Sequence, residues 1–187
     1  MWRWASLSSL LLALLAPPPG ARAGEGAPVD AALDRAVPQA VVRQKDTLVL
    51  SGQQARRVQR VAGSPLPTRL VTRYRLYSGA GRLLAVAYVD THLVRSLAET
   101  LLIVVDDGGK VRRVEVLAFK EPPEYRPRAT WYGQFEGRGL DGELQVRRGI
   151  RVLAGATLSS HAATDAVRRV LAVHQILPPA LQLGERP

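Results

Sequence analysis

The residues with the clearest chemical signal in this chain lie together in the segment IRVLAGATLSS, at positions 150–160. A strand-like approach ends in three small residues, Ala154, Gly155 and Ala156, and Thr157 then leads through two serines toward an amphipathic stretch. Main-chain N–H groups in such a turn point to the same place as the positive end of the helix dipole that follows. The segment could therefore hold a phosphate, although small residues before a capped helix also occur for purely structural reasons.

The sequence around this turn predicts how it is supported. A helix is expected over residues 160–175, with Ser159 or Ser160 as its N-cap. Three arginines precede the turn, namely Arg147, Arg148 and Arg151. Guanidinium groups suit phosphate oxygens, so these arginines favour an anion at the turn; the alternative is a solvated basic strand end.

Composition excludes several other chemistries. The chain contains no cysteine, which removes disulfides, zinc fingers, iron–sulfur ligation and thiol nucleophiles. The three histidines, His92, His161 and His174, are scattered, so no metal is expected, and each is interpreted as structural or as a polar neighbour of the turn. No catalytic base with a partner, G-x-G-x-x-G pattern or P-loop is present, so no catalytic residue is assigned.

The beginning of the chain predicts export. Residues 1–23, MWRWASLSSLLLALLAPPPGARA, have a basic head, a short apolar run and an Ala-Arg-Ala end, as secretory signal peptides do. The apolar run is shorter than the roughly 20 residues that cross a bilayer, although an uncleaved membrane anchor is the alternative. The net charge is +10 and comes almost entirely from arginine. Export argues against a nucleic-acid partner, and the basic surface suits acidic proteins or anionic lipids.

The middle of the chain predicts an antiparallel sheet. Two hairpins follow from alternating apolar residues around Gly-rich turns: strands 70–77 and 82–90, then strands 100–105 and 111–119. Four strands in a meander are the simplest arrangement, with one sheet face free to take a helix or a ligand. Together with helices at both ends, this pattern predicts an α+β fold.

The N-terminal part of the mature chain predicts helices. One helix is expected over residues 29–43, interrupted or ended by Pro38. A short strand at 47–50 leads to Ser51, the N-cap of a second helix that closes at Gly63. The expected organisation is a signal peptide at 1–23, a helical segment at 24–66 and an α+β domain at 67–187.

An irregular segment after residue 119 concentrates aromatic side chains. Prolines forbid regular strand pairing in KEPPEYRPRATWYGQFEGR, and four aromatic residues fall within it: Tyr125, Trp131, Tyr132 and Phe135. Two interpretations stay open. The rings clamp a loop onto the core, or they form a stacking wall for a planar ligand.

The string AGATLSS before an amphipathic helix resembles the signature D-x-x-S/T-G-A-T of the FMN-binding domain family, found in periplasmic subunits of the Rnf complex and the sodium-translocating NADH:quinone oxidoreductase. The resemblance implies that Thr157 is the threonine whose hydroxyl is esterified to the flavin phosphate. It also places Glu121 at the family's glutamate and Trp131 with Phe135 in its W-x-x-x-F segment, over residues 82–175 overall. The cofactor-binding set it implies is completed by Ala154, Gly155, Ala156, Leu158, Ser159, Ser160 and Arg151.

Two positions depart from the family pattern: Arg151 stands in place of the aspartate and Ala154 in place of the serine or threonine. Because a flavin transferase is thought to read that aspartate, both covalent FMN at Thr157 and non-covalent FMN stay open. The resemblance implies an exported, periplasmic electron-transfer flavoprotein rather than a substrate-converting enzyme. Its partners would be membrane-bound or periplasmic redox proteins, with possible association with the inner membrane. The alternative is an exported binding or scaffold module that has lost its flavin.

Overall fold

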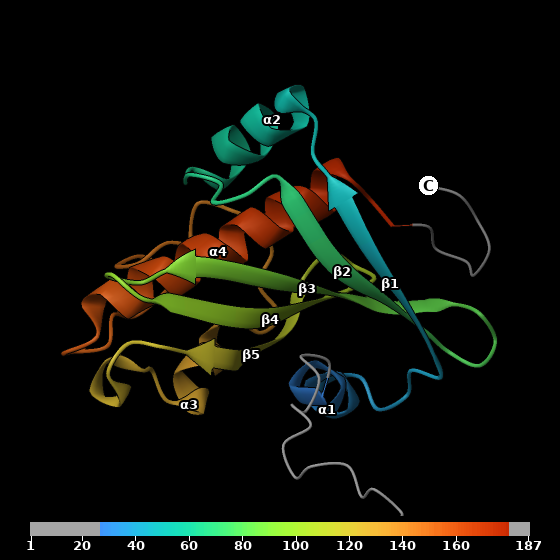
Figure 1. Cartoon of the computed structure of the whole chain (residues 1–187), viewed down its shortest axis with the longest axis horizontal. Helices are drawn as coiled ribbons and strands as arrows, with labels where there is room; N and C mark the ends of the chain where they lie inside the picture. The colour runs from blue at the N-terminus through green and yellow to red at the C-terminus, as the bar shows by residue number, and fades with distance from the viewer. Residues whose placement is uncertain (1–26, 180–187) are drawn as a thin grey trace, which may run out of the picture.

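The computed structural model describes residues 27–179, so the predicted signal peptide at 1–23 lies outside the described residues. Its centre is a five-stranded antiparallel sheet in the order β1-β2-β3-β4-β5 (Figure 1). The strands are β1 (Val42–Val49), β2 (Leu70–Tyr77), β3 (Leu83–Leu93), β4 (Ala98–Asp106) and β5 (Val111–Phe119). The predicted α+β class and meander are confirmed, with β1 as an additional edge strand.

The predicted helix over residues 29–43 is too long, because the chain leaves the helix at Ala36 and enters β1 at Val42. Helix α1 (Ala27–Ala36) ends two residues before Pro38, and a turn closes with the Ala40 N–H donating to the Val37 carbonyl. The chain then pairs with β2, from Val42 opposite Tyr77 to Val49 opposite Leu70. Proline has no N–H and disfavours helix at the residue before it, so the helix stops and the following residues are free to join the sheet.

The second predicted helix is confirmed with its caps. In α2 (Gly52–Ala62) the Ser51 hydroxyl accepts from the Gln54 N–H, and the Gln54 side chain accepts from the Ser51 N–H. Gly63 ends the helix in the left-handed region, at φ +71°, which costs glycine little. Three short helical pieces and one long helix complete the described part of the chain: the 3₁₀ turn Pro123–Tyr125, α3 (Ala129–Tyr132), the 3₁₀ turn Gly133–Phe135, and α4 (Thr157–Ile176).

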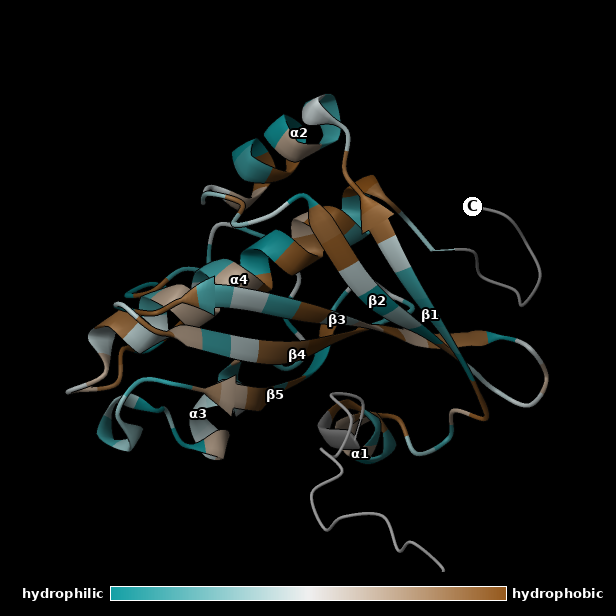
Figure 2. Cartoon of the chain, in the orientation of Figure 1, coloured by the Kyte–Doolittle hydropathy of each residue, from teal (hydrophilic) through white to brown (hydrophobic). Residues whose placement is uncertain are grey.

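Both faces of the sheet are covered in its middle. Val86 and Tyr88 of β3 pack in the core beneath α4 and α2, whereas the alternate residues Ala85 and Ala87 pack against α1. Figure 2 shows the apolar colour through the middle of β3 and β4, where side chains on both faces are buried, and hydrophilic colour nearer to the β3–β4 loop. The sheet face that was expected to take a helix or a ligand therefore takes a helix, because α4 covers one face of these strands and α1 covers the opposite face.

The N-terminal elements share this architecture. Strand β1 extends the sheet through β2, and α2 packs on α4 with Ala55, Val58 and Ala62. Across residues 27–179, no helix is both long enough and apolar enough to span a bilayer.

Candidate functional site

A cavity of about 180 Å³ opens at the start of α4. Three segments that are far apart in the sequence form its wall: the β3–β4 loop, the turn after β5, and the first residues of α4. The lining residues are Val94, Arg95, Glu121, Tyr125, Gly155, Ala156, Thr157, Leu158 and Ser159. Six of the predicted site residues therefore line one cavity, and we call it the Thr157 pocket.

The start of α4 presents unpaired donors to this pocket. Gly155 has φ +81°, a conformation that favours glycine, and the Ala156 N–H donates to the Leu153 carbonyl at 3.0 Å. The helix then begins at Thr157, whose side chain is exposed. Within residues 27–179 no acceptor takes the N–H groups of Thr157, Leu158 or Ser159. These donors and the helix dipole make the pocket attractive to an anion.

The two serines do not cap the helix as predicted. The helix begins at Thr157, three residues earlier than expected, so both serines lie in its first turn. The Ser159 hydroxyl donates to the Tyr125 carbonyl at 2.6 Å. The Ser160 hydroxyl donates to the Ala156 carbonyl at 3.0 Å and accepts from the Leu153 N–H at 3.1 Å. Ser160 is buried away from the pocket, and the two hydroxyls fix the first turn to its surroundings.

Glu121 fastens the β3–β4 loop to the pocket. Its Oε1 accepts hydrogen bonds from the backbone N–H groups of Arg95, Ser96 and Leu97, at 3.1, 2.7 and 2.8 Å. The bonds from Leu97 and Ser96 are the main cause that lowers the pKa of Glu121 below 4.5. The carboxylate that the sequence places in the site thus holds a loop in position.

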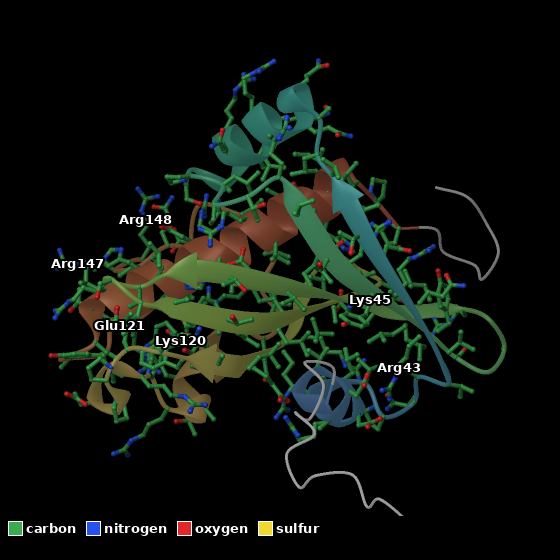
Figure 3. The ribbon with its side chains drawn as sticks, viewed as in Figure 1. Arg43, Lys45, Lys120, Glu121, Arg147 and Arg148 are labelled. Atoms are coloured by element: carbon green, nitrogen blue, oxygen red, sulfur yellow. The ribbon has the colours of Figure 1, made fainter. Side chains whose placement is uncertain are left out.

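Arg95 is the cation of the pocket. Its guanidinium lies over the Tyr125 ring, 5.0 Å from the ring centroid, and its side chain is exposed. The predicted arginine cluster differs: Arg151 lines another hollow, and neither Arg147 nor Arg148 lines the Thr157 pocket. Figure 3 shows Arg147 and Arg148 near the end of the molecule that carries Glu121.

Trp131 and Arg151 belong to a second hollow, of about 440 Å³. The Trp131 Nε1 donates to the Arg151 carbonyl at 2.9 Å, so the indole fixes the strand-like approach to α4. Phe135 is fully buried, and its ring packs edge-on against Trp131 at 5.4 Å. With Tyr132 buried as well, the aromatic segment is clamped onto the core by its rings. Ala154 is exposed and lines neither hollow.

A buried polar network lies at the root of the β3–β4 loop. His92 is the register partner of Glu99, and its Nε2 is 3.1 Å from Glu99 Oε2. Its Nδ1 is 2.8 Å from Asp90 Oδ1. The Tyr132 hydroxyl donates to Glu99 Oε1 at 2.7 Å, and Arg169 of α4 donates to Asp90 Oδ1 at 3.0 Å. The network joins β3, β4, α3 and α4.

The charges of this network balance when His92 is protonated. Carboxylate oxygens only accept, so both ring nitrogens of His92 donate. Burial alone would lower the pKa of His92, but the hydrogen bonds to Asp90 and Glu99 outweigh it and raise that pKa above 6.5. Burial would raise the pKa of Asp90, yet its contacts with His92 and Arg169 hold it below 3.8. Two cations therefore match two carboxylates, which makes their burial tolerable.

None of the histidines lines the Thr157 pocket. His174 Nδ1 is 3.0 Å from the Tyr88 hydroxyl, and burial lowers the pKa of His174 below 6.5. His161 lines a separate hollow with Gly63 and Arg168.

Comparison with protein families gives a match to part of the chain. The sequence model of the FMN-binding domain family matches residues 98–172, from the start of β4 to the last turns of α4. This range contains Glu121, Tyr125 and the start of α4, whereas Val94 and Arg95 precede it. Comparisons with curated proteins and with solved structures gave no match.

Proposed function

We propose that the Thr157 pocket holds FMN by its phosphate and that the protein is an exported flavin electron carrier, since residues 98–172 match the sequence model of the FMN-binding domain family. The family match supports flavin binding. The observation that carries the proposed site is the group of free N–H donors at the start of α4 beside the Arg95 guanidinium.

The residues of the pocket fit a phosphate. The N–H groups of Thr157, Leu158 and Ser159 and the Thr157 hydroxyl are donors without partners within residues 27–179. Arg95 adds a charge-assisted donor. A carboxylate that is already saturated by three N–H groups, as Glu121 Oε1 is, repels an anion less than a free one would.

The cavity also limits how much of the ligand is enclosed. Its volume of about 180 Å³ is below the roughly 300–1,000 Å³ of sites that bury a whole drug-sized molecule. The pocket would therefore enclose the phosphate end, with Leu158 and Tyr125 as apolar contacts at its wall. The remainder of the ligand would stay accessible, as exchange of electrons with a partner protein requires.

Electron transfer suits these residues better than substrate turnover. The titratable side chains that line the pocket are Arg95, Glu121 and Tyr125, and the Glu121 carboxylate is engaged with the loop. No lining group is thus available as a general base. Bound FMN would supply one- or two-electron redox chemistry, while this chain would bind and orient it. The proposed partners are membrane-bound or periplasmic redox proteins, reached after export directed by residues 1–23.

Non-covalent binding is the proposed mode. Thr157 has an exposed hydroxyl, as an ester would need, but Arg151 and Ala154 replace the family residues that a flavin transferase is thought to read. The Arg151 backbone is also engaged: its N–H donates to Gln134 Oε1 at 2.8 Å and its carbonyl accepts from Trp131.

Periplasmic expression in a host that carries the flavin transferase tests the proposal. Yellow protein that loses its flavin on denaturation supports non-covalent binding, and flavin fluorescence retained after denaturation indicates the ester at Thr157. Colourless protein that also rejects added FMN contradicts the carrier function. That last outcome would favour a second candidate, a flavin-free scaffold module, which the substitutions at Arg151 and Ala154 motivate.

A further inference from the structure

A long stretch of the chain carries positive charge without any negative charge. Between Asp46 and Asp90 there is no aspartate or glutamate, and seven arginines fall in this interval. Three of them have acidic partners from other segments: Arg73 and Arg75 pair with Asp46, and Arg82 pairs with Asp107. The other four are Arg56, Arg57, Arg60 and Arg69. All four are exposed, and no ion pair joins them to a carboxylate among residues 27–179.

Three of these arginines form the outer face of α2. The helix buries Ala55, Val58 and Ala62 against the core, so the 3.6-residue period places Gln53, Arg56, Arg57 and Arg60 on the opposite side. Arg56 and Arg60 are four residues apart, a spacing at which like charges destabilise a helix. The first turn also has no acidic residue. The Arg56–Arg60 repulsion therefore works against the helix, whereas Arg60 in the last turn also complements the helix dipole.

Exposed apolar side chains adjoin this cationic face. Val49 is 66% exposed and Leu70 is 57% exposed, and the two are register partners at the ends of β1 and β2. Val61, on the flank of α2, is 38% exposed. Figure 1 shows α2 projecting at the end of the sheet where β1 and β2 meet the segments that lead into and out of it. We call these seven residues the α2 face: Val49, Arg56, Arg57, Arg60, Val61, Arg69 and Leu70.

We propose that the α2 face docks on an anionic lipid surface. Arginines near negatively charged headgroups gain electrostatic energy without needing a matched partner geometry, and separate aliphatic side chains can enter the interface beside them. The α2 face carries no aromatic residue, whereas the interfaces of protein partners usually include aromatic anchors at their centre. Anionic headgroups would supply the negative charge that the sequence lacks between Asp46 and Asp90.

This inference does not depend on FMN. The residues of the α2 face line no part of the Thr157 pocket, which is built from the β3–β4 loop, the turn after β5 and the first turn of α4. Membrane docking would hold the carrier near membrane-bound partners if the proposed function is right. It would persist in a flavin-free scaffold if that function is wrong.

Sedimentation with lipid vesicles tests the proposal on the mature chain. The protein should bind vesicles of equal parts phosphatidylcholine and phosphatidylglycerol, ignore pure phosphatidylcholine, and dissociate as salt is raised. The triple variant Arg56→Gln, Arg57→Gln and Arg60→Gln should bind about 100-fold more weakly, at about fivefold per arginine. Leu70→Ser should weaken binding further without changing the charge.

A charge-matched variant provides the control. Lys45→Gln, Lys110→Gln and Lys120→Gln remove the same charge from exposed positions outside α2, and Figure 3 labels Lys45 and Lys120 away from that helix. The control should retain most of the binding. Because the arginine substitutions relieve the Arg56–Arg60 repulsion but also remove the favourable charge of Arg60 in the last turn, the Tm should change little, which circular dichroism checks. Equal loss in both triple variants would overturn the docking face. The proposal would also be overturned if the wild-type protein failed to bind anionic vesicles but bound polyglutamate, and the α2 triple variant did not bind polyglutamate. The partner would then be an acidic polypeptide.

Discussion

The imidazole of His92 on β3 lies opposite the carboxylate of Glu99 on β4, with 3.1 Å between Nε2 and Oε2. Glu99 is fully inaccessible to solvent, and His92 nearly so. Because Asp90 occupies the other ring nitrogen, the proton on His92 decides whether two carboxylates and one arginine can stay buried together. The network fixes the strand ends from which the β3–β4 loop, and thus Arg95, projects.

Replacing this histidine should produce a pH-dependent loss of stability. His92→Gln removes the second cation of a buried network, so we expect the free energy of unfolding to fall by about 3–5 kcal/mol below pH 6.5. The folded-state pKa of His92 is raised, so its contribution is complete below 6.5 and is lost as pH rises through the raised value. The gap between wild type and variant should therefore narrow at alkaline pH in urea titrations.

Two other groups also make the free energy of unfolding depend on pH. Asp90 has a lowered pKa, so its contribution is present above 3.8 and is lost as pH falls through the lowered value. His174 has a lowered pKa, and its contribution is lost as pH falls below 6.5, in the opposite direction to that of His92. His174 is common to both proteins and cancels in the comparison. A gap that stays constant with pH would mean that His92 is neutral in the fold.

Glu121 should control the order of the β3–β4 loop. In Glu121→Ala the N–H groups of Arg95, Ser96 and Leu97 lose their shared acceptor, so their hydrogen exchange should accelerate while exchange within β5 stays the same. Glu124→Ala is the matched control, because Glu124 is exposed and only three residues away. Unchanged exchange at Ser96 and Leu97 in the Glu121 variant would show that the loop is ordered by other contacts.

Phe135 should matter for stability and not for ligand affinity. Its ring is fully buried and lines no part of the Thr157 pocket. Phe135→Ala should cost about 3–5 kcal/mol, as deletion of a core ring does. The milder Phe135→Leu should remain folded and bind FMN within about twofold of wild type, measured by fluorescence titration. A large loss of FMN affinity in folded Phe135→Leu would indicate that this ring contributes to the FMN site, as the sequence pattern implies.

Local patterns predicted the elements whose signals are local. Ser51 and Gly63 mark the two ends of α2 within thirteen residues, and the Gly-rich turns define both hairpins. The small turn before Thr157 was predicted to begin a helix, and it does. Edge strand β1 was mostly missed because its alternation is diluted by polar residues, and its pairing with β2 spans the whole of α2. Its position depends on contacts that no local window contains.

The pocket could be predicted only in part for the same reason. Glu121 and the residues from Gly155 to Ser159 were found by their order along the chain and do meet at one cavity. Arg95 sits in a four-residue connection with no motif of its own, and only the antiparallel register of β3 and β4 brings it there. Arg151 is close to Thr157 in sequence, yet its backbone is tied to Trp131 and Gln134 and its side chain lines another hollow.

Arg95 should therefore contribute more to FMN affinity than the arginines nearer to Thr157 in the sequence. Arg95→Gln removes a charge-assisted donor worth about 1.5–3 kcal/mol, so we expect Kd for FMN to rise about 10- to 100-fold. Arg147→Gln removes the same charge from an exposed position outside the pocket and should change Kd by less than about threefold through long-range attraction alone. Equal changes in Kd for the two substitutions would indicate that long-range electrostatic attraction, and not a contact between Arg95 and the phosphate, sets the affinity.

We propose that the start of α4 binds the phosphate of FMN. Fluorescence titration of the protein with FMN and with riboflavin, which differ by that phosphate, tests this proposal. Charge-assisted hydrogen bonds from the free N–H groups and Arg95 should make FMN bind at least about tenfold more tightly than riboflavin. Thr157→Pro removes the N–H group and the hydroxyl at the first helical position and keeps the N–H groups of Leu158 and Ser159. It should therefore reduce the preference for FMN over riboflavin. Equal affinity for FMN and riboflavin, or no binding of either, would rule out a phosphate site at the start of α4.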